Sequence, residues 1–197
     1  LSNDWIWALH EDPEGGLWIG TNGGGLSRYE PETGVFTSFR DPDTTPEGTN
    51  ANRIRAIHSS GAGTLWIGTD SGLKVFDPQT ASFTRYPIPN APLGTDSDRV
   101  RAILEDRDGL LWVSTDGNGR LRINPESGDA RRFRHDPERP DSLGSDRVRC
   151  AFEDRRGVLW VGLYDGGIDR MVRRNESFAH FRHDAEDPTS VPHDRVR

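Results

Sequence analysis

One short motif returns four times along the 197-residue chain and constrains its fold more than any other feature. It reads Leu-Trp-Ile-Gly-Thr at 17–21 and 65–69, Leu-Trp-Val-Ser-Thr at 111–115 and Leu-Trp-Val-Gly-Leu at 159–163. Its tryptophans are 48, 46 and 48 residues apart: Trp18, Trp66, Trp112 and Trp160. Self-similarity at such a period indicates a repeat protein, in which each unit completes its core against its neighbours.

Each repeat contains four short apolar-rich runs that are separated by Gly, Asp, Asn and Pro, and no helical periodicity is sustained. Such runs are typical of short strands joined by tight turns. Within 111–114, Trp112 and Ser114 share one face of the expected strand, while Leu111 and Val113 share the other. Both faces carry apolar groups, so the strand is expected to lie between two sheets.

These features predict an all-β β-propeller with four four-stranded antiparallel blades. The blades are expected at about 3–40, 52–87, 98–135 and 146–183, and residues 194–197 repeat the start of a further blade. We expect the four repeat tryptophans to be buried between blades. Trp5, which precedes the first motif, is expected nearer an exposed edge.

The full pattern resembles the two-component regulator propeller repeat. It is carried by Asp-Arg-Val-Arg-Ala-Ile at 98–103, Glu-Asp-x-x-Gly-x-Leu-Trp at 105–112 and an Asn-Pro-x-Ser-Gly turn at 124–128, with related segments in the other repeats. Repeat 4 departs from the turn pattern at 173–177, and Ala81 stands where repeats 1 and 3 have glycine. The resemblance implies a larger propeller of about seven blades, of which this chain is a part.

The resemblance also implies a function. It points to the periplasmic sensor region of hybrid two-component histidine kinases, which would bind a ligand such as an oligosaccharide and bias a linked kinase. The partners implied are that ligand, further propeller blades and downstream signalling domains. We expect no enzyme activity within this chain. The alternatives are a polysaccharide hydrolase or lyase, and a passive scaffold for protein interaction.

Residues that break the repeat near the inner strands are the candidates for ligand binding. Trp5 and Trp7 stand where the later repeats have pairs of arginines: Arg53 and Arg55, Arg99 and Arg101, Arg147 and Arg149. Paired aromatic rings can stack on a sugar, and arginines can hold an acidic sugar or another carboxylate. The other explanation for the two tryptophans is packing against a blade that precedes them.

Other residues are expected to be structural. His135-Asp136 and His183-Asp184 are 48 residues apart and lack the short spacings of zinc sites, so we expect no metal and no cofactor. The repeated Glu-Asp turns are expected to hold hairpins rather than to act as acid and base. Cys150 replaces an alanine of the other repeats, which predicts a small buried residue and not a nucleophile.

The charge balance excludes some classes of partner. The net charge is −7, which disfavours bulk binding of nucleic acid because that requires a basic surface. No stretch approaches the roughly 18 apolar residues of a membrane span, so we expect no insertion of this segment into a membrane.

Overall fold

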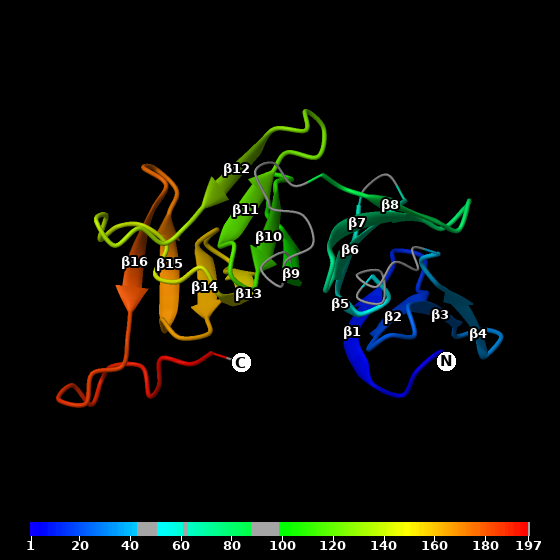
Figure 1. Ribbon diagram of the computed structural model, residues 1–197, viewed down its shortest axis with the longest axis horizontal. Helices are drawn as coiled ribbons and strands as arrows, with labels where there is room; N and C mark the ends of the chain where they lie inside the picture. The colour runs from blue at the N-terminus through cyan, green and yellow to red at the C-terminus, as the bar shows by residue number, and fades with distance from the viewer. Residues whose placement is uncertain (43–50, 61–62, 88–98, 197) are drawn as a thin grey trace. The chain divides into compact units, whose positions relative to one another are not determined.

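The computed structural model describes residues 1–42, 51–60, 63–87 and 99–196 (Figure 1). This part of the chain is all-β, and it contains no helix with the length and hydropathy needed to cross a membrane. The strands are β1 (Ile6–Glu11), β2 (Leu17–Thr21), β3 (Leu26–Glu30), β4 (Val35–Phe39), β5 (Ile54–Ser59), β6 (Leu65–Thr69), β7 (Gly72–Asp77), β8 (Ser82–Arg85), β9 (Val100–Glu105), β10 (Leu111–Thr115), β11 (Arg120–Ile123), β12 (Ala130–Phe133), β13 (Val148–Glu153), β14 (Leu159–Leu163), β15 (Ile168–Val172) and β16 (Ser177–Phe181).

The strands form four sheets of four, and within each sheet every strand lies beside its neighbour in the chain. The sheets are β1–β4 (blade 1), β5–β8 (blade 2), β9–β12 (blade 3) and β13–β16 (blade 4), each a separate meander in Figure 1. This arrangement confirms the predicted propeller blades. The chain divides into two compact units, Leu1–Ile103 and Leu104–Arg197, with the boundary inside β9.

Tight turns join the strands, and glycine supplies the left-handed backbone that these turns need. Gly109 closes the β9–β10 hairpin with a φ of 74°. At the third hairpin, blades 1 and 3 also have glycine, whereas Ala81 and Glu176 adopt φ values of 53° and 54° in blades 2 and 4. The two departures from the repeat pattern therefore keep the turn conformation at a steric cost.

In the first unit, the small residue of the repeat motif lets blade 2 approach blade 1 closely. A Cβ on Gly20 would lie 2.6 Å from Ile54 Cγ2 and 3.1 Å from the Ala8 side chain. Trp18, on the same strand, packs with its ring centroid 5.9 Å from that of Phe39 and 5.7 Å from that of Phe76. Aromatic rings of two blades thus share one core cluster.

The second unit repeats this packing between blades 3 and 4. The rings of Trp112 and Phe133 are 5.6 Å apart, and Phe133 lies 5.9 Å from Phe178. On the other side of blade 4, a Cβ on Gly162 would lie 2.7 Å from Val196 Cγ1. Val196 therefore packs on blade 4 as Ile54 packs on blade 1.

The prediction for the repeat tryptophans was correct for three of them and wrong for Trp160. Trp18, Trp66 and Trp112 are 2%, 6% and 1% exposed, whereas Trp160 is only partly buried. The Trp160 ring lies 5.7 Å from that of Phe181, which is itself 39% exposed, because no further sheet among the described residues covers this face of blade 4. Trp5 is 69% exposed, as predicted.

Two of the predicted blade limits, residues 98 and 197, lie outside the described residues. The predicted start of the next blade is described at 194–196. There, Gly167 N–H donates to the Asp194 carbonyl at 2.8 Å, and Val196 N–H donates to the Leu163 carbonyl at 2.9 Å.

Candidate ligand-binding site

The inner strands β1, β5 and β13 each contain a bulge at a predicted candidate residue. In blade 1, Ile6 pairs with Thr21 and Ala8 with Gly20, so Trp7 is the extra residue. The same shift in β5 and β13 makes Arg55 and Arg149 the extra residues. Because a bulge breaks the alternation of side chains, it re-aims the side chain at that position.

In the first unit, three of the predicted arginines converge on Asp70. Arg99 Nε lies 3.0 Å from Asp70 Oδ1, and Arg55 Nη2 donates to Oδ2 at 3.1 Å while its Nε contacts Oδ1. Arg53 Nη1 lies 3.7 Å from Oδ2. The Asp70 side chain is only 1% exposed, whereas that of Arg53 is 46% exposed. Three guanidinium groups thus surround one carboxylate, and the exposed cation of Arg53 favours an anionic ligand.

The two candidate tryptophans lie beside this arginine group but differ in their surroundings. Arg55 Cζ lies 3.8 Å from the centre of the Trp7 ring, a cation–π contact that covers one face of the indole. Trp7 remains 36% exposed. Trp5 lines an open hollow of about 470 Å³ together with the N-terminal residues and Asn22. Both rings thus present surface to solvent.

The second unit contains a related arginine group around Asp116 and Tyr164. Arg147 Nε lies 3.4 Å from Asp116 Oδ1, and Arg149 Nη1 lies 3.9 Å from Oδ2. The Cζ atoms of these arginines lie 3.8 and 4.3 Å from the centre of the Tyr164 ring. Arg195 also stacks on that ring and donates to its hydroxyl at 2.6 Å.

The last predicted arginine, Arg101, lies on β9 two residues after Arg99 and is partly buried.

Sequence reasoning missed the residues that organise these arginines. Asp70, Asp116 and Tyr164 all directly follow the second strand of their blades, where blade 1 has Asn22. The sequence contained a signal for them, because the residue at this position differs between blades although the motif before it recurs in all four. Variation beside a repeated framework indicates a surface that is not needed for packing.

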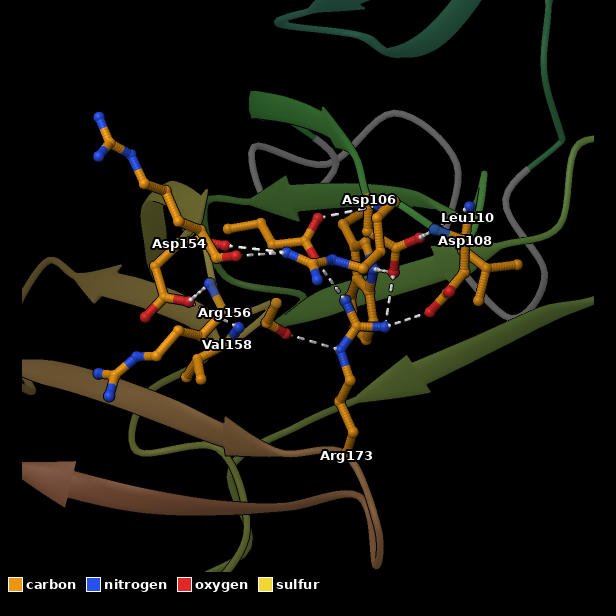
Figure 2. Close-up of polar contacts among 12 residues, drawn as sticks. Asp106, Asp108, Leu110, Asp154, Arg156, Val158 and Arg173 are labelled. Atoms are coloured by element: carbon orange, nitrogen blue, oxygen red, sulfur yellow. Dashed lines mark hydrogen bonds and ion pairs between the residues drawn. The ribbon is translucent and has the colours of Figure 1, made fainter.

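The hairpin carboxylates have the structural role that the repeat predicted (Figure 2). Asp106 Oδ1 accepts from the N–H groups of Asp108 and Leu110, both at 3.0 Å, and Oδ2 accepts from Trp112 Nε1 at 2.7 Å. In the same way, Asp154 Oδ1 accepts from the backbone N–H groups of Arg156 and Val158, and Oδ2 accepts from Trp160 Nε1. Each carboxylate is held by its turn and by the indole of the repeat tryptophan, which fixes the hairpin on its sheet.

The equivalent turn of blade 1 is held by Asp12, which binds Gly16 N–H and Trp18 Nε1 at 2.8 and 2.9 Å. Burial acts to raise the pKa of Asp12. The hydrogen bonds from Gly16 and Trp18, together with the Arg28 cation, outweigh that effect and hold the pKa below its ordinary value. Asp12 is thus a stable anion at neutral pH.

The histidines of the long loops bind the loops themselves. Nδ1 of His135 lies 2.9 Å from the Leu143 carbonyl oxygen, and Nδ1 of His183 lies 3.0 Å from that of Val191.

His10, on β1, contacts blade 2. Its Nε2 lies 2.6 Å from Ser59 Oγ and accepts the Ser59 N–H at 3.1 Å. Within the described ranges, no three His, Cys, Asp or Glu side chains are grouped as metal ligands.

The prediction that Cys150 is buried was wrong. Its side chain is exposed on blade 4, on the same open face as Trp160 and Phe152. The equivalent Ala56 is buried because a following strand covers it, with Val100 packed on the adjacent Gly68. Neighbouring protein atoms still partly desolvate the Cys150 thiol and raise its pKa, which disfavours the reactive thiolate.

Comparison with known proteins agrees with the fold and with the repeat. Residues 1–23, 94–117 and 142–165 match the two component regulator propeller family. No curated protein matches the chain in sequence.

Solved structures extend the comparison to nearly the whole chain. One, described as the extracellular domain of a hybrid two component system of B. thetaiotaomicron, is 27% identical over 94% of this chain and 25% of its own, with a TM-score of 0.72. A second domain described in the same way, from the same organism, is 23% identical over 93% of this chain and 25% of its own, with a TM-score of 0.73.

Virginiamycin B lyase from Staphylococcus aureus shares the fold at 17% identity, covering 94% of this chain and 58% of its own, with a TM-score of 0.69. This chain thus spans a quarter of the length of the two extracellular domains. Its four blades form a propeller segment, and three of its repeats contain segments that match the two component regulator propeller family.

Proposed function

We propose that this chain is part of the extracytoplasmic, periplasmic sensor domain of a two-component signalling receptor and binds an anionic ligand. The observation that carries the proposal is the arginine group on Asp70 beside the exposed ring of Trp7. The likeness to an extracellular domain of a hybrid two component system supports the location and the role.

An oligosaccharide that contains a uronic acid fits the chemistry of this group. A sugar carboxylate can pair with Arg53, whose guanidinium is the most exposed of the three, while Asp70 holds Arg55 and Arg99 in place. The apolar face of a sugar ring can stack on Trp5 or Trp7, as aromatic side chains permit. The exposed positive charge of Arg53 supplies the preference for an acidic over a neutral sugar.

Signalling follows from binding only if the ligand prefers one arrangement of the receptor over another. Further blades and a linked kinase in the parent protein would supply these arrangements. The packing of Val196 on Gly162, which matches that of Ile54 on Gly20, supports a further blade after blade 4. On blade 1, Leu9 is 62% exposed whereas the equivalent Ile57 is 9% exposed, which supports a preceding blade.

Calorimetric titration of the 197-residue chain with an oligogalacturonate and with a neutral oligosaccharide of equal length tests this proposal. We expect the acidic sugar to bind, and Arg53→Ala to weaken its binding about fivefold through loss of an exposed charge-assisted hydrogen bond. Arg139→Ala is the matched control, because Arg139 has a 67% exposed side chain in a loop of the other unit and should leave binding unchanged.

The outcomes separate this proposal from its alternatives. Equal binding of both sugars, or no effect of Arg53→Ala, would contradict an arginine site. Cleavage of the sugar would instead support a hydrolase or lyase. Absence of binding to any member of a glycan panel would favour a scaffold role.

A further inference from the structure

The hairpins between the first and second strands differ between the two units in a way that defines a second candidate site. In the second unit, charged side chains fill the space between the hairpins of blades 3 and 4. In the first unit, the same space between blades 1 and 2 is a cleft of about 380 Å³. This volume lies within the range of small-molecule pockets.

In the second unit, Arg173 connects the two hairpins, as Figure 2 shows. Its Nη1 lies 2.6 Å from Asp108 Oδ2 and 3.3 Å from Asp106 Oδ2. Its Nη2 lies 2.9 Å from Glu153 Oε1, and its Nε donates to the Gly157 carbonyl at 3.1 Å. One guanidinium is therefore bound by three carboxylates and a backbone carbonyl.

Arg107 fills the remaining space in that unit. Its Nε donates to Glu153 Oε1 at 2.8 Å, and its backbone N–H donates to Oε2 at 2.9 Å. A Cβ on Gly157 would lie 2.7 Å from Arg107 Cζ, whereas a Cβ on the equivalent Gly63 of blade 2 would meet no atom within 4 Å. The same repeat position is thus filled in one unit and open in the other.

The repeat alignment explains why the cleft of the first unit is open. Arg107, Glu153 and Arg173 correspond to Pro13, Ser59 and Pro78, which are smaller or uncharged, and all three of these line the cleft. The acceptors of Arg173 are largely kept. Asp106, Asp108 and Gly157 correspond to Asp12, Glu14 and Gly63, which also line the cleft.

The charge of the cleft remains negative despite one internal arginine. Arg28 Nη2 lies 3.0 Å from Asp12 Oδ2 and 3.5 Å from Glu14 Oε2, and its Nη1 lies 2.6 Å from Glu30 Oε1. Glu30 lies outside the cleft, so the charged side chains that line it, those of Asp12, Glu14 and Arg28, have a formal charge of −1. The hydroxyls of Ser59 and Thr64 add neutral polar groups to the lining.

We infer that the cleft between blades 1 and 2 binds a guanidinium group supplied by a ligand, in the place that Arg173 occupies between blades 3 and 4. The group can come from a free guanidino compound or from an arginine side chain of a peptide partner. This site lies at the opposite end of β1 from Trp7, so it is separate from the arginine group on Asp70 and does not depend on the sensor proposal.

The indole N–H resonances of the tryptophans provide a local test. Trp18 Nε1–H donates to Asp12 in the cleft, while Trp112 and Trp160 make the same bond to Asp106 and Asp154 in the other unit. Titration of the 15N-labelled 197-residue chain with Nα-acetyl-arginine amide should shift the Trp18 indole resonance saturably. The other two indoles should not shift, and Nα-acetyl-citrulline amide, which lacks the charge, should have no effect.

Variants at the cleft make the test specific. Pro78→Arg should abolish the shift, because it supplies the missing guanidinium from within the chain, whereas Pro78→Ala should keep it. Glu14→Gln should weaken binding about threefold, since the Glu14 side chain is 84% exposed and its ion pairs are screened. Glu32→Gln, the same change on an exposed turn outside the cleft, is the matched control and should leave binding unchanged.

A capped Gly-Gly-Arg-Gly-Gly peptide distinguishes the two sources of the group. Binding tenfold tighter than that of the single residue would assign the cleft to a peptide, and equal binding would assign it to a small guanidino compound. A Trp18 shift that is absent, that is equal with citrulline, or that persists in Pro78→Arg would overturn the inference.

Discussion

Arg120 is a buried cation whose replacement should stabilise the protein. It lies in β11 opposite Ser114, at a position where the other blades have Leu26, Leu73 and Ile168. Its side chain is fully buried, and its three guanidinium nitrogens have no hydrogen-bond partner among the described residues. The Arg120 guanidinium stacks on the Trp112 ring, with Cζ 4.4 Å from the ring centre. We therefore expect Arg120→Leu to increase the free energy of unfolding.

The magnitude follows from the pKa of the guanidinium. Burial, opposed by the Asp106 charge, lowers the pKa of Arg120 far below its ordinary value, to about 9. At about 1.4 kcal/mol per pKa unit, that difference corresponds to a penalty of roughly 5 kcal/mol at neutral pH. Loss of the cation–π contact subtracts about 1–2 kcal/mol from the gain. The expected net stabilisation by Arg120→Leu is about 3 kcal/mol.

The pH dependence provides an independent check. Because the folded-state pKa is below the unfolded value, the penalty is fully present below about pH 9. Above that pH the folded protein releases the proton before the unfolded chain does, so the penalty falls as the pH rises further. The advantage of Arg120→Leu over the parent chain should therefore be constant from pH 7 to 8.5 and smaller at pH 10.

Urea unfolding followed by far-ultraviolet circular dichroism measures both the stabilisation by Arg120→Leu and its dependence on pH. Arg174→Leu is the matched control, since Arg174 is exposed and its replacement should change stability by less than about 0.5 kcal/mol. A destabilised Arg120→Leu, or an advantage that does not change up to pH 10, would refute the reasoning.

Three further changes test the repeat framework. Ala81→Gly should raise the free energy of unfolding by about 1 kcal/mol in urea titrations, because φ is 53° there; no gain would show that the turn is unstrained. Asp106→Ala should cost about 3 kcal/mol by calorimetry, since it removes the acceptor of Trp112 and two turn hydrogen bonds; a cost below 1 kcal/mol would contradict this role. Burial and His58 lower the pKa of His10, so the free energy of unfolding should fall as the pH drops below 6.5. His10→Asn should make the urea midpoint depend less steeply on pH between pH 7.5 and 5. An unchanged pH dependence would show that another group causes the loss of stability.

The fold was largely predictable because the repeat fixes which residues must be buried. The motif at 111–115 places Trp112 beside a small residue, and this pattern alone indicates a strand packed between two sheets. Misjudged burial at Trp160 and Cys150 has one cause. A repeat predicts the average environment of a position, whereas these two side chains lie on the open face of blade 4.

The candidate sites were only partly predictable. The sequence singled out the arginines at the start of the inner strands of blades 2, 3 and 4. It could not pair Arg99 with Asp70, which is 29 residues earlier and in another blade. Nor could it show that Pro13, Ser59 and Pro78 line a cleft. A smaller side chain leaves a cleft only where no neighbouring group fills the space, and the neighbours are known only from the tertiary structure.

The sequence by itself determined the blade, its turns and the order of its strands, since these depend on local alternation and on glycine and proline at fixed positions. The tertiary structure alone decided which charges meet. Ion pairs depend on distances between hairpins and strands of neighbouring blades, and a repeat with the same backbone can fill such a space with Arg173 or leave it open beside Pro78.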